Sequence, residues 1–167
     1  MAFRHLLVPT DFSEPANYAL QYAVEEAVLH RARVTLLHVQ PTDAGTDVYY
    51  VSGAPVSGLG AGVDVLAGGR LGTTPVSEPT VVRRDSSEAA LTRLRDLVPE
   101  ACRGTWEVAI AVGRPADTIV RFARERQADL IVMATHGRTG LEHVVMGSVA
   151  EKVVRLAPCP VLTVKGG

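Results

Sequence analysis

Two short polar segments stand out because each directly follows an apolar run typical of a buried strand. Pro9-Thr10-Asp11 follows Leu6–Val8, and Thr135-His136-Gly137 follows Leu130–Ala134. The carboxyl ends of parallel strands meet at one edge of a sheet, and open α/β sheets bind their ligands there. The two segments therefore predict a binding site that contains a carboxylate, hydroxyl groups and an imidazole.

The pair Gly147-Ser148 adds a second chemical signal, because it opens a predicted helix after a polar loop that contains Gly137. Glycine lets a backbone approach a phosphate closely, and the N–H groups at a helix N-terminus complement its negative charge. Ser148 and Glu151 also fit the Ser-x-x-Glu capping box, which is a purely structural interpretation. The two interpretations are compatible, because a capped helix can still bind an anion.

The elements that must position these residues alternate along the chain. Apolar runs predict strands at about 6–8, 34–39, 106–112, 130–134 and 160–164. Between them, helices are predicted from a Ser13 cap to about His30, from Ser86 or Ser87 to before Pro99, from Pro115, and from Gly147-Ser148 to about Leu156. Strand–helix–strand units cross over right-handedly into parallel sheets. The fold class is therefore α/β, a doubly wound five-stranded parallel sheet of Rossmann-like type.

A segment at about residues 42–85 interrupts this alternation. It is rich in glycine and proline and shows no sustained helical or strand period, apart from a local strand candidate at Tyr49–Val51. We interpret it as an insertion within a single domain spanning residues 1–167. Its composition offers little apolar burial to offset the entropy of ordering, so the insertion is predicted to be the most mobile part of the chain.

Composition excludes several classes of protein. The 167 residues include 17 Lys+Arg and 18 Asp+Glu, so the net charge of −1 argues against nucleic-acid binding. No apolar run approaches the roughly 18 residues that a membrane span needs, and the N-terminus does not resemble a secretory signal. Two cysteines are too few for a disulfide framework. A cytoplasmic protein without a membrane or nucleic-acid partner is expected.

Other chemistry-bearing residues receive structural interpretations. His38 ends a core strand and is read as a packed histidine, and Cys159 between two prolines is read as structural. The histidines show no metal-ligand spacing, and no Gly-x-Ser-x-Gly or supported cysteine suggests a nucleophile. No catalytic residue and no metal site are predicted.

Four segments, in this order, closely resemble the universal stress protein family. They are Leu7–Ser13, Ile131–Gly140, Met146–Val153 and Cys159–Val164. The resemblance covers the chain outside the insertion and implies the strand order 3-2-1-4-5, which places the first and fourth strands side by side. That order agrees with the two strand ends chosen above on chemical grounds.

Nucleotide-binding members of this family carry Gly, two residues, Gly, nine residues, and Gly-Ser or Gly-Thr. This sequence keeps the spacing but has Ala134 at the first glycine. If that position demands a positive φ, the methyl group costs on the order of 1 kcal/mol. If the position is ordinary strand, the methyl group only reduces the space beside the ribose. Either alternative weakens ATP binding rather than abolishing it.

The resemblance also implies which residues bind the nucleotide. Asp11 and Val39 match positions at the adenine, and Met133 and Ala134 match positions near the ribose. The positions that surround the phosphates or line the same cleft match His136, Gly137, Gly147, Ser148, Val149, Pro9, Thr10, Gly113 and Arg114.

The function implied is a stress-response protein that binds ATP or a related adenine nucleotide (AMP, ADP or cyclic AMP), with Mg²⁺ or Mn²⁺ accompanying the triphosphate. It would act as a nucleotide-responsive regulator or chaperone-like factor, with slow ATP hydrolysis at most. Similar members pair through the last strand, so a homodimer through Val161–Val164 is expected. The alternative is a member that binds no nucleotide and acts through dimerisation and protein contacts.

Overall fold

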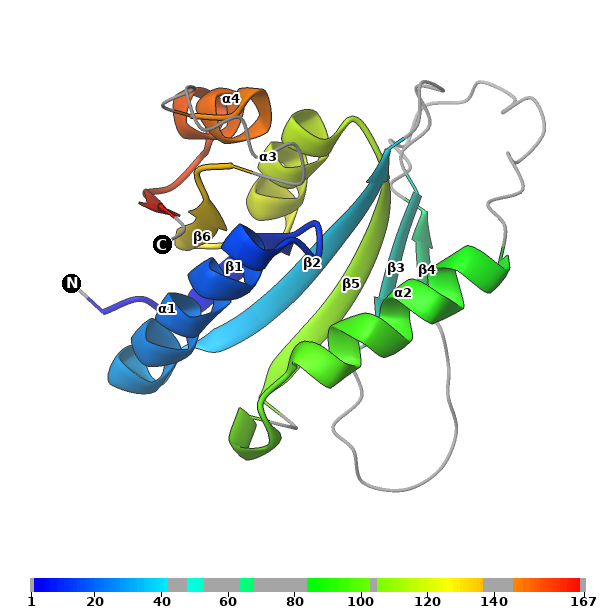
Figure 1. The fold of residues 1–167 in the computed structure, drawn as a ribbon, viewed down its shortest axis with the longest axis horizontal. Coiled ribbons are helices and arrows are strands. Elements are labelled where there is room, and N and C mark those ends of the chain that lie inside the picture. Colours follow the sequence, from blue (N-terminus) through cyan, green and yellow to red (C-terminus); the bar gives the residue numbers. More distant parts are fainter. Residues whose placement is uncertain are drawn as a thin grey trace.

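Five parallel strands form the centre of the computed structural model, which describes residues 2–41, 48–52, 64–67, 84–102, 105–136 and 146–165 (Figure 1). They lie in the spatial order β5-β2-β1-β6-β7. Counted along the chain, these five strands have the order 3-2-1-4-5, so the predicted parallel sheet is confirmed. Their bounds are His5–Thr10 (β1), Arg33–Pro41 (β2), Trp106–Gly113 (β5), Leu130–Ala134 (β6) and Val161–Val164 (β7).

Two further strands lie within the insertion and extend the sheet beyond β5. β3 (Val48–Ser52) pairs antiparallel with both β5 and β4 (Asp64–Ala67). The sequence indicated only a local strand at Tyr49–Val51, because pairing with β5 joins residues far apart in the chain. Residues 84 and 85 begin a helix, and the rest of the insertion lies outside the described residues, so its predicted mobility stays a prediction.

The helices cover both faces of the sheet, as a doubly wound fold requires (Figure 1). One hydrophobic cluster joins Leu6 and Val8 to buried residues of α1 and α2, and the other joins Leu7 to buried residues of α3 and α4. Successive side chains of a strand point to opposite faces, so β1 alone supplies both clusters. The helices are Glu14–His30 (α1), Arg84–Leu97 (α2), Pro115–Glu125 (α3) and Ser148–Leu156 (α4), with a short 3₁₀ turn at Glu100–Cys102.

The first helix begins and ends as the sequence predicts. Ser13 is its N-cap, with Oγ accepting a hydrogen bond from the Ala16 N–H at 3.3 Å. Its buried face consists mostly of alanines, so the α1 backbone lies close to the sheet. The second helix differs from the prediction, since it begins at Arg84, before the expected caps at Ser86 or Ser87.

The pairing of β1 with its two neighbours is unequal. β1 is in register with β2 over six residue pairs, from His5↔Arg33 to Thr10↔His38, but with β6 over only two, Leu6↔Leu130 and Leu7↔Ile131. Beyond Leu7 no further β1–β6 pairs are formed. The carboxyl ends of these two strands therefore leave room between them at the point where the strand order reverses.

Candidate functional site

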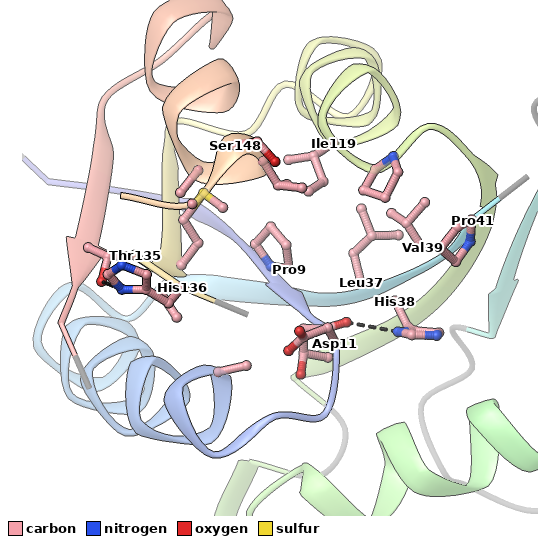
Figure 2. Close-up of a pocket in the computed structure, with 18 residues that line it drawn as sticks. Pro9, Asp11, Leu37, His38, Val39, Pro41, Ile119, Thr135, His136 and Ser148 are labelled. Atoms are coloured by element: carbon pink, nitrogen blue, oxygen red, sulfur yellow. Dashed lines mark hydrogen bonds between the residues drawn. The ribbon is translucent and has the colours of Figure 1, made fainter. Parts of the chain in front are cut away.

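A cavity of about 410 Å³ lies at this reversal point (Figure 2). Its walls come from the ends of β1, β2 and β6, from the first turns of α1 and α4, and from the first half of α3. The volume falls within the range of small-molecule sites. The predicted nucleotide-binding residues that line the cavity are Pro9, Thr10, Asp11, Val39, Met133, Ala134, His136, Gly147, Ser148 and Val149.

Three predicted residues are not among those that line it. Gly113 ends β5, which is separated from β1 by β2, and Arg114 is exposed at the start of α3, so only the next residue, Pro115, reaches the cavity. Gly113 is the register partner of Pro41, which does line the cavity, and the role of Gly113 and Arg114 in binding stays a prediction. Gly137 lies outside the described residues.

The segment after β1 is held in an unusual backbone conformation. Phe12 has a φ of 63°, in the left-handed region, which is costly for a bulky residue. The Phe12 N–H donates to Thr10 Oγ1 at 3.1 Å, and the Ser13 N–H donates to Asp11 Oδ1 at 3.1 Å. Local hydrogen bonds thus fix the turn that presents Asp11 to the cavity.

His38 lies beside this turn rather than only in the core. Its Nδ1 donates to the Thr10 carbonyl oxygen at 2.8 Å, shown as a dashed line in Figure 2, and its ring lines the cavity. The sequence interpretation as a packed histidine was therefore incomplete. The available signal was its place at the carboxyl end of β2, the edge where ligands bind.

The start of α4 differs from the predicted capping box. Gly147, not Ser148, is the N-cap, and it supplies no side-chain cap; Ser148 is already the first helical residue and is exposed. The first intrahelical hydrogen bond runs from the Glu151 N–H to the Gly147 carbonyl oxygen at 2.9 Å. The N–H groups of Ser148, Val149 and Ala150 precede that bond, and all three residues line the cavity. This first turn provides a set of donors and a positive dipole end for an anion.

Gly147 also has a structural role. Its N–H donates to the Thr135 carbonyl oxygen at 2.8 Å, and a Cβ at this position would lie 3.3 Å from the same oxygen. That spacing is tighter than most Cβ contacts, so a side chain would push the start of α4 away from the end of β6. The glycine therefore sets how closely the helix N-terminus approaches the cavity.

Ala134 occupies ordinary strand geometry. It pairs with Val164 in the β6–β7 register, it is 8% exposed, and it is not among the residues with positive φ. Of the two alternatives for the missing glycine, the second therefore holds. The methyl group takes up space at the cavity wall without straining the backbone.

The cavity has an apolar part and a polar part. The apolar part is lined by side chains that the sequence analysis did not assign to the site: Leu37, Pro41, Pro115 and Ile119. Figure 2 places Val39 and Pro41 together with Ile119 on one side and Thr135 with His136 on the other. A ligand with an apolar ring and an anionic group matches both parts.

Other chemistry is scarce in the described parts of the chain. No group of three or more His, Cys, Asp or Glu residues with the arrangement of a metal site occurs among the residues that could be searched. None of the helices described is long and apolar enough to cross a membrane. Burial, together with the nearby Asp129 carboxylate, raises the pKa of the Cys159 thiol, which disfavours the nucleophilic thiolate.

Several known proteins are similar to this chain in sequence and in fold. The universal stress protein MJ0531 of Methanocaldococcus jannaschii is 32% identical over 98% of this chain and 82% of its own length. The solved structure of MJ0577 superimposes with a TM-score of 0.67 at 25% identity, covering 99% of this chain and 97% of that one. A universal stress protein solved in complex with cAMP shares the fold, with a TM-score of 0.61 at 21% identity and full coverage of both chains.

The family comparison covers nearly the whole chain. The sequence model of the Universal stress protein family matches residues 2–59 and 62–165, which include both strand ends at the cavity and the start of α4. The solved structure of MJ0577 shares the fold as well. The chain belongs to the universal stress protein family.

Proposed function

We propose that this protein binds ATP or a related adenine nucleotide (AMP, ADP or cyclic AMP) in the cavity and acts as a nucleotide-responsive regulator in the cytoplasm. The observation that carries the proposal is the first turn of α4, whose backbone donors open onto a cavity with an apolar part. A related protein solved with cAMP supports an adenine nucleotide as the ligand class.

The two parts of the cavity suggest how the nucleotide is oriented. An aromatic base gains most from the apolar side chains Val39, Pro41 and Ile119, and Asp11 at the neighbouring strand end can accept hydrogen bonds from it. The phosphates gain most from the Ser148–Ala150 N–H groups and the α4 dipole. The ribose then lies between them, next to Met133 and Ala134.

A divalent cation fits this arrangement only together with the nucleotide. Asp11 is the one carboxylate among the described lining residues, and its Oδ1 already accepts hydrogen bonds from Ser13. Mg²⁺ or Mn²⁺ would therefore be held chiefly by phosphate oxygens and water, as is usual for Mg²⁺ in nucleotide sites. The cation supplies charge neutralisation of the triphosphate.

Isothermal titration with ATP, ADP, AMP and cyclic AMP, with and without Mg²⁺, tests the proposal directly. We expect micromolar binding of at least one of these nucleotides. Mass spectrometry of nucleotide released from the denatured protein gives an independent readout. The absence of heat and of a thermal shift with all four ligands would favour the alternative of a family member that acts through dimerisation and protein contacts.

We further propose a homodimer formed through β7. This strand is the last one at its end of the sheet, and Val161, Leu162 and Thr163 are only partly buried. An apolar edge strand is a natural site for pairing. Light scattering at tens of micromolar should show a dimer, and Val161→Lys should convert it to a monomer; a wild-type monomer would contradict the proposal.

A further inference from the structure

A stack of three side chains connects the cavity wall to α2. The Phe12 and His38 rings lie 4.4 Å apart between centroids, tilted by 41°. The guanidinium carbon of Arg93, on α2, lies 4.2 Å from the Phe12 ring centroid. His38 in turn lines the cavity, so the contacts run from the cavity through His38 and Phe12 to α2.

The stack acts on the segment that presents Asp11. Phe12 has the left-handed φ of 63°, and non-glycine residues hold such conformations only where the surroundings over-determine them. Here the surroundings are the His38 ring, the Arg93 guanidinium, and hydrogen bonds to both oxygens of Thr10: His38 Nδ1 donates to its carbonyl and the Phe12 N–H to its hydroxyl. Removing one layer of the stack removes part of what holds this turn.

We propose that Phe12, which contacts both Arg93 and His38, is a positioning residue that couples nucleotide binding in the cavity to the packing of α2. The inference rests on the proposed nucleotide function. Nucleotide in the cavity fixes the Thr10–Asp11 turn and the His38 ring, which holds the Phe12 ring in place for Arg93. The coupling is reciprocal, so a docked Arg93 strengthens nucleotide binding.

Helix α2 is the element through which this coupling would reach the rest of the protein. It follows the insertion directly and packs on the same face of the sheet as α1 through Ala90, Leu91 and Leu94. Arg93 is exposed on that helix, so its contact with Phe12 can form and break without disturbing the core. The occupied and empty cavity would therefore differ in how firmly the second half of α2, which carries Arg93, is held.

The test combines ATP titration with hydrogen exchange of α2 amides. We expect ATP to slow exchange in both α2 and the first turn of α4 in the wild type. Arg93→Gln should keep the α4 protection, lose the ATP-induced α2 protection, and weaken ATP affinity by about two- to fivefold, the scale of one exposed cation–π contact. Arg95→Gln removes the same charge from the same helix outside the stack and should keep the ATP-induced protection of α2.

Two Phe12 variants separate the ring from general packing. Phe12→Leu should weaken ATP affinity by about tenfold, whereas Phe12→Tyr keeps the aromatic face and should restore it. If Phe12→Leu does not fold, the exposed Arg93→Gln variant still decides the question. Wild-type protein that binds ATP without any change in α2 exchange, or an Arg93→Gln variant with unaltered affinity and α2 protection, would overturn the coupling. Failure of the wild type to bind any adenine nucleotide would instead overturn the proposed function, and the coupling with it.

Discussion

The two edges of the sheet both gather polar side chains, but they use them differently. At the amino edge, His5 is 4% exposed and its Nε2 lies 2.8 Å from Thr35 Oγ1. The Thr35 hydroxyl donates to Glu107 at 3.2 Å, and Glu107 pairs with Arg126 at 3.6 Å. The other ring nitrogen of His5, Nδ1, lies 3.0 Å from the Arg126 carbonyl oxygen and 3.2 Å from a guanidinium nitrogen of Arg33. These polar groups are satisfied by one another.

At the carboxyl edge, polar groups face a cavity instead. The first-turn N–H groups of α4 have no side-chain cap, and Asp11 and His136 border the same space. Buried polar groups are normally paired inside the protein, so donors that open onto a cavity are available to a ligand. The amino edge therefore contributes stability, and the carboxyl edge is built for binding.

The largest effect is expected at the amino edge. His5→Leu leaves the Thr35 hydroxyl and neighbouring charged groups without their buried partner, and it should lower the free energy of unfolding by about 2–3 kcal/mol. ATP affinity should stay within about twofold of the wild-type value. Urea denaturation and calorimetry measure the two quantities. A stability loss below about 0.5 kcal/mol would show that His5 contributes little to stability. A large loss of ATP affinity in folded protein would show that the amino edge also affects binding.

At the carboxyl edge, Gly147→Val should lose ATP affinity by well over tenfold. The side chain meets the Thr135 carbonyl oxygen and shifts the α4 N-terminus away from the phosphates, at a cost to the free protein of about 1 kcal/mol. Ser148→Ala is the matched control at the next residue: because Ser148 is not the cap, its stability should change by less than about 0.5 kcal/mol. Gly147→Val protein that folds cooperatively and binds ATP normally would refute the phosphate site.

The pH dependence of stability reports on His5. Burial, followed by the positive charge of Arg33, lowers the pKa of this imidazole below its usual 6.5. The unfolded chain then binds a proton that the folded protein rejects, so stability should be complete above about pH 6.5 and fall as the pH drops toward the folded-state pKa, with a slope of at most about 1.4 kcal/mol per pH unit. Denaturation curves between pH 5 and 7.5, compared with His5→Leu, measure this slope. An equal slope in His5→Leu would show that titratable groups other than His5 cause the pH dependence of stability.

The smallest effect is expected for Ala134→Gly. No positive φ is relieved at this strand position, so ATP affinity should change by less than about threefold. The added chain entropy of glycine should cost the free protein about 0.5–1 kcal/mol. A tenfold gain in affinity would show that the alanine methyl group, and not backbone geometry, limits the site.

Local patterns in the sequence predicted most of the framework. The Ser13 cap, the early Pro15 and the helical spacing of alanines predicted α1 correctly, because these signals act within a few residues. The antiparallel pairing of β3 with β5 was not predicted, since it depends on residues distant in the chain. Ser148 satisfied a capping pattern, yet the helix begins one residue earlier than that pattern requires, with Gly147 as its N-cap and the Gly147 N–H bonded back to the Thr135 carbonyl oxygen.

The site was predictable where chemistry coincided with a strand end. Asp11 and His136 follow apolar runs and line the cavity, as the topology requires. His38 and Phe12 were harder to assign. Their roles depend on a contact between two rings that lie far apart in the sequence, and on a left-handed backbone conformation that phenylalanine rarely adopts. The apolar lining residue Ile119 has no local signal that separates it from a core residue.

The unequal pairing of β1 has a mechanical consequence. Since β1 shares six register pairs with β2 and two with β6, the boundary between β1 and β6 has fewer paired residues to resist twisting than the boundary between β1 and β2. Helix α1 packs on both β1 and β6 and so bridges the boundary between them with its alanine-lined face. Twisting β6 and β7 relative to β1 and β2 would change the width of the cavity while leaving the hydrogen bonds within each pair of strands intact. A molecule bound in the cavity would therefore limit this twist.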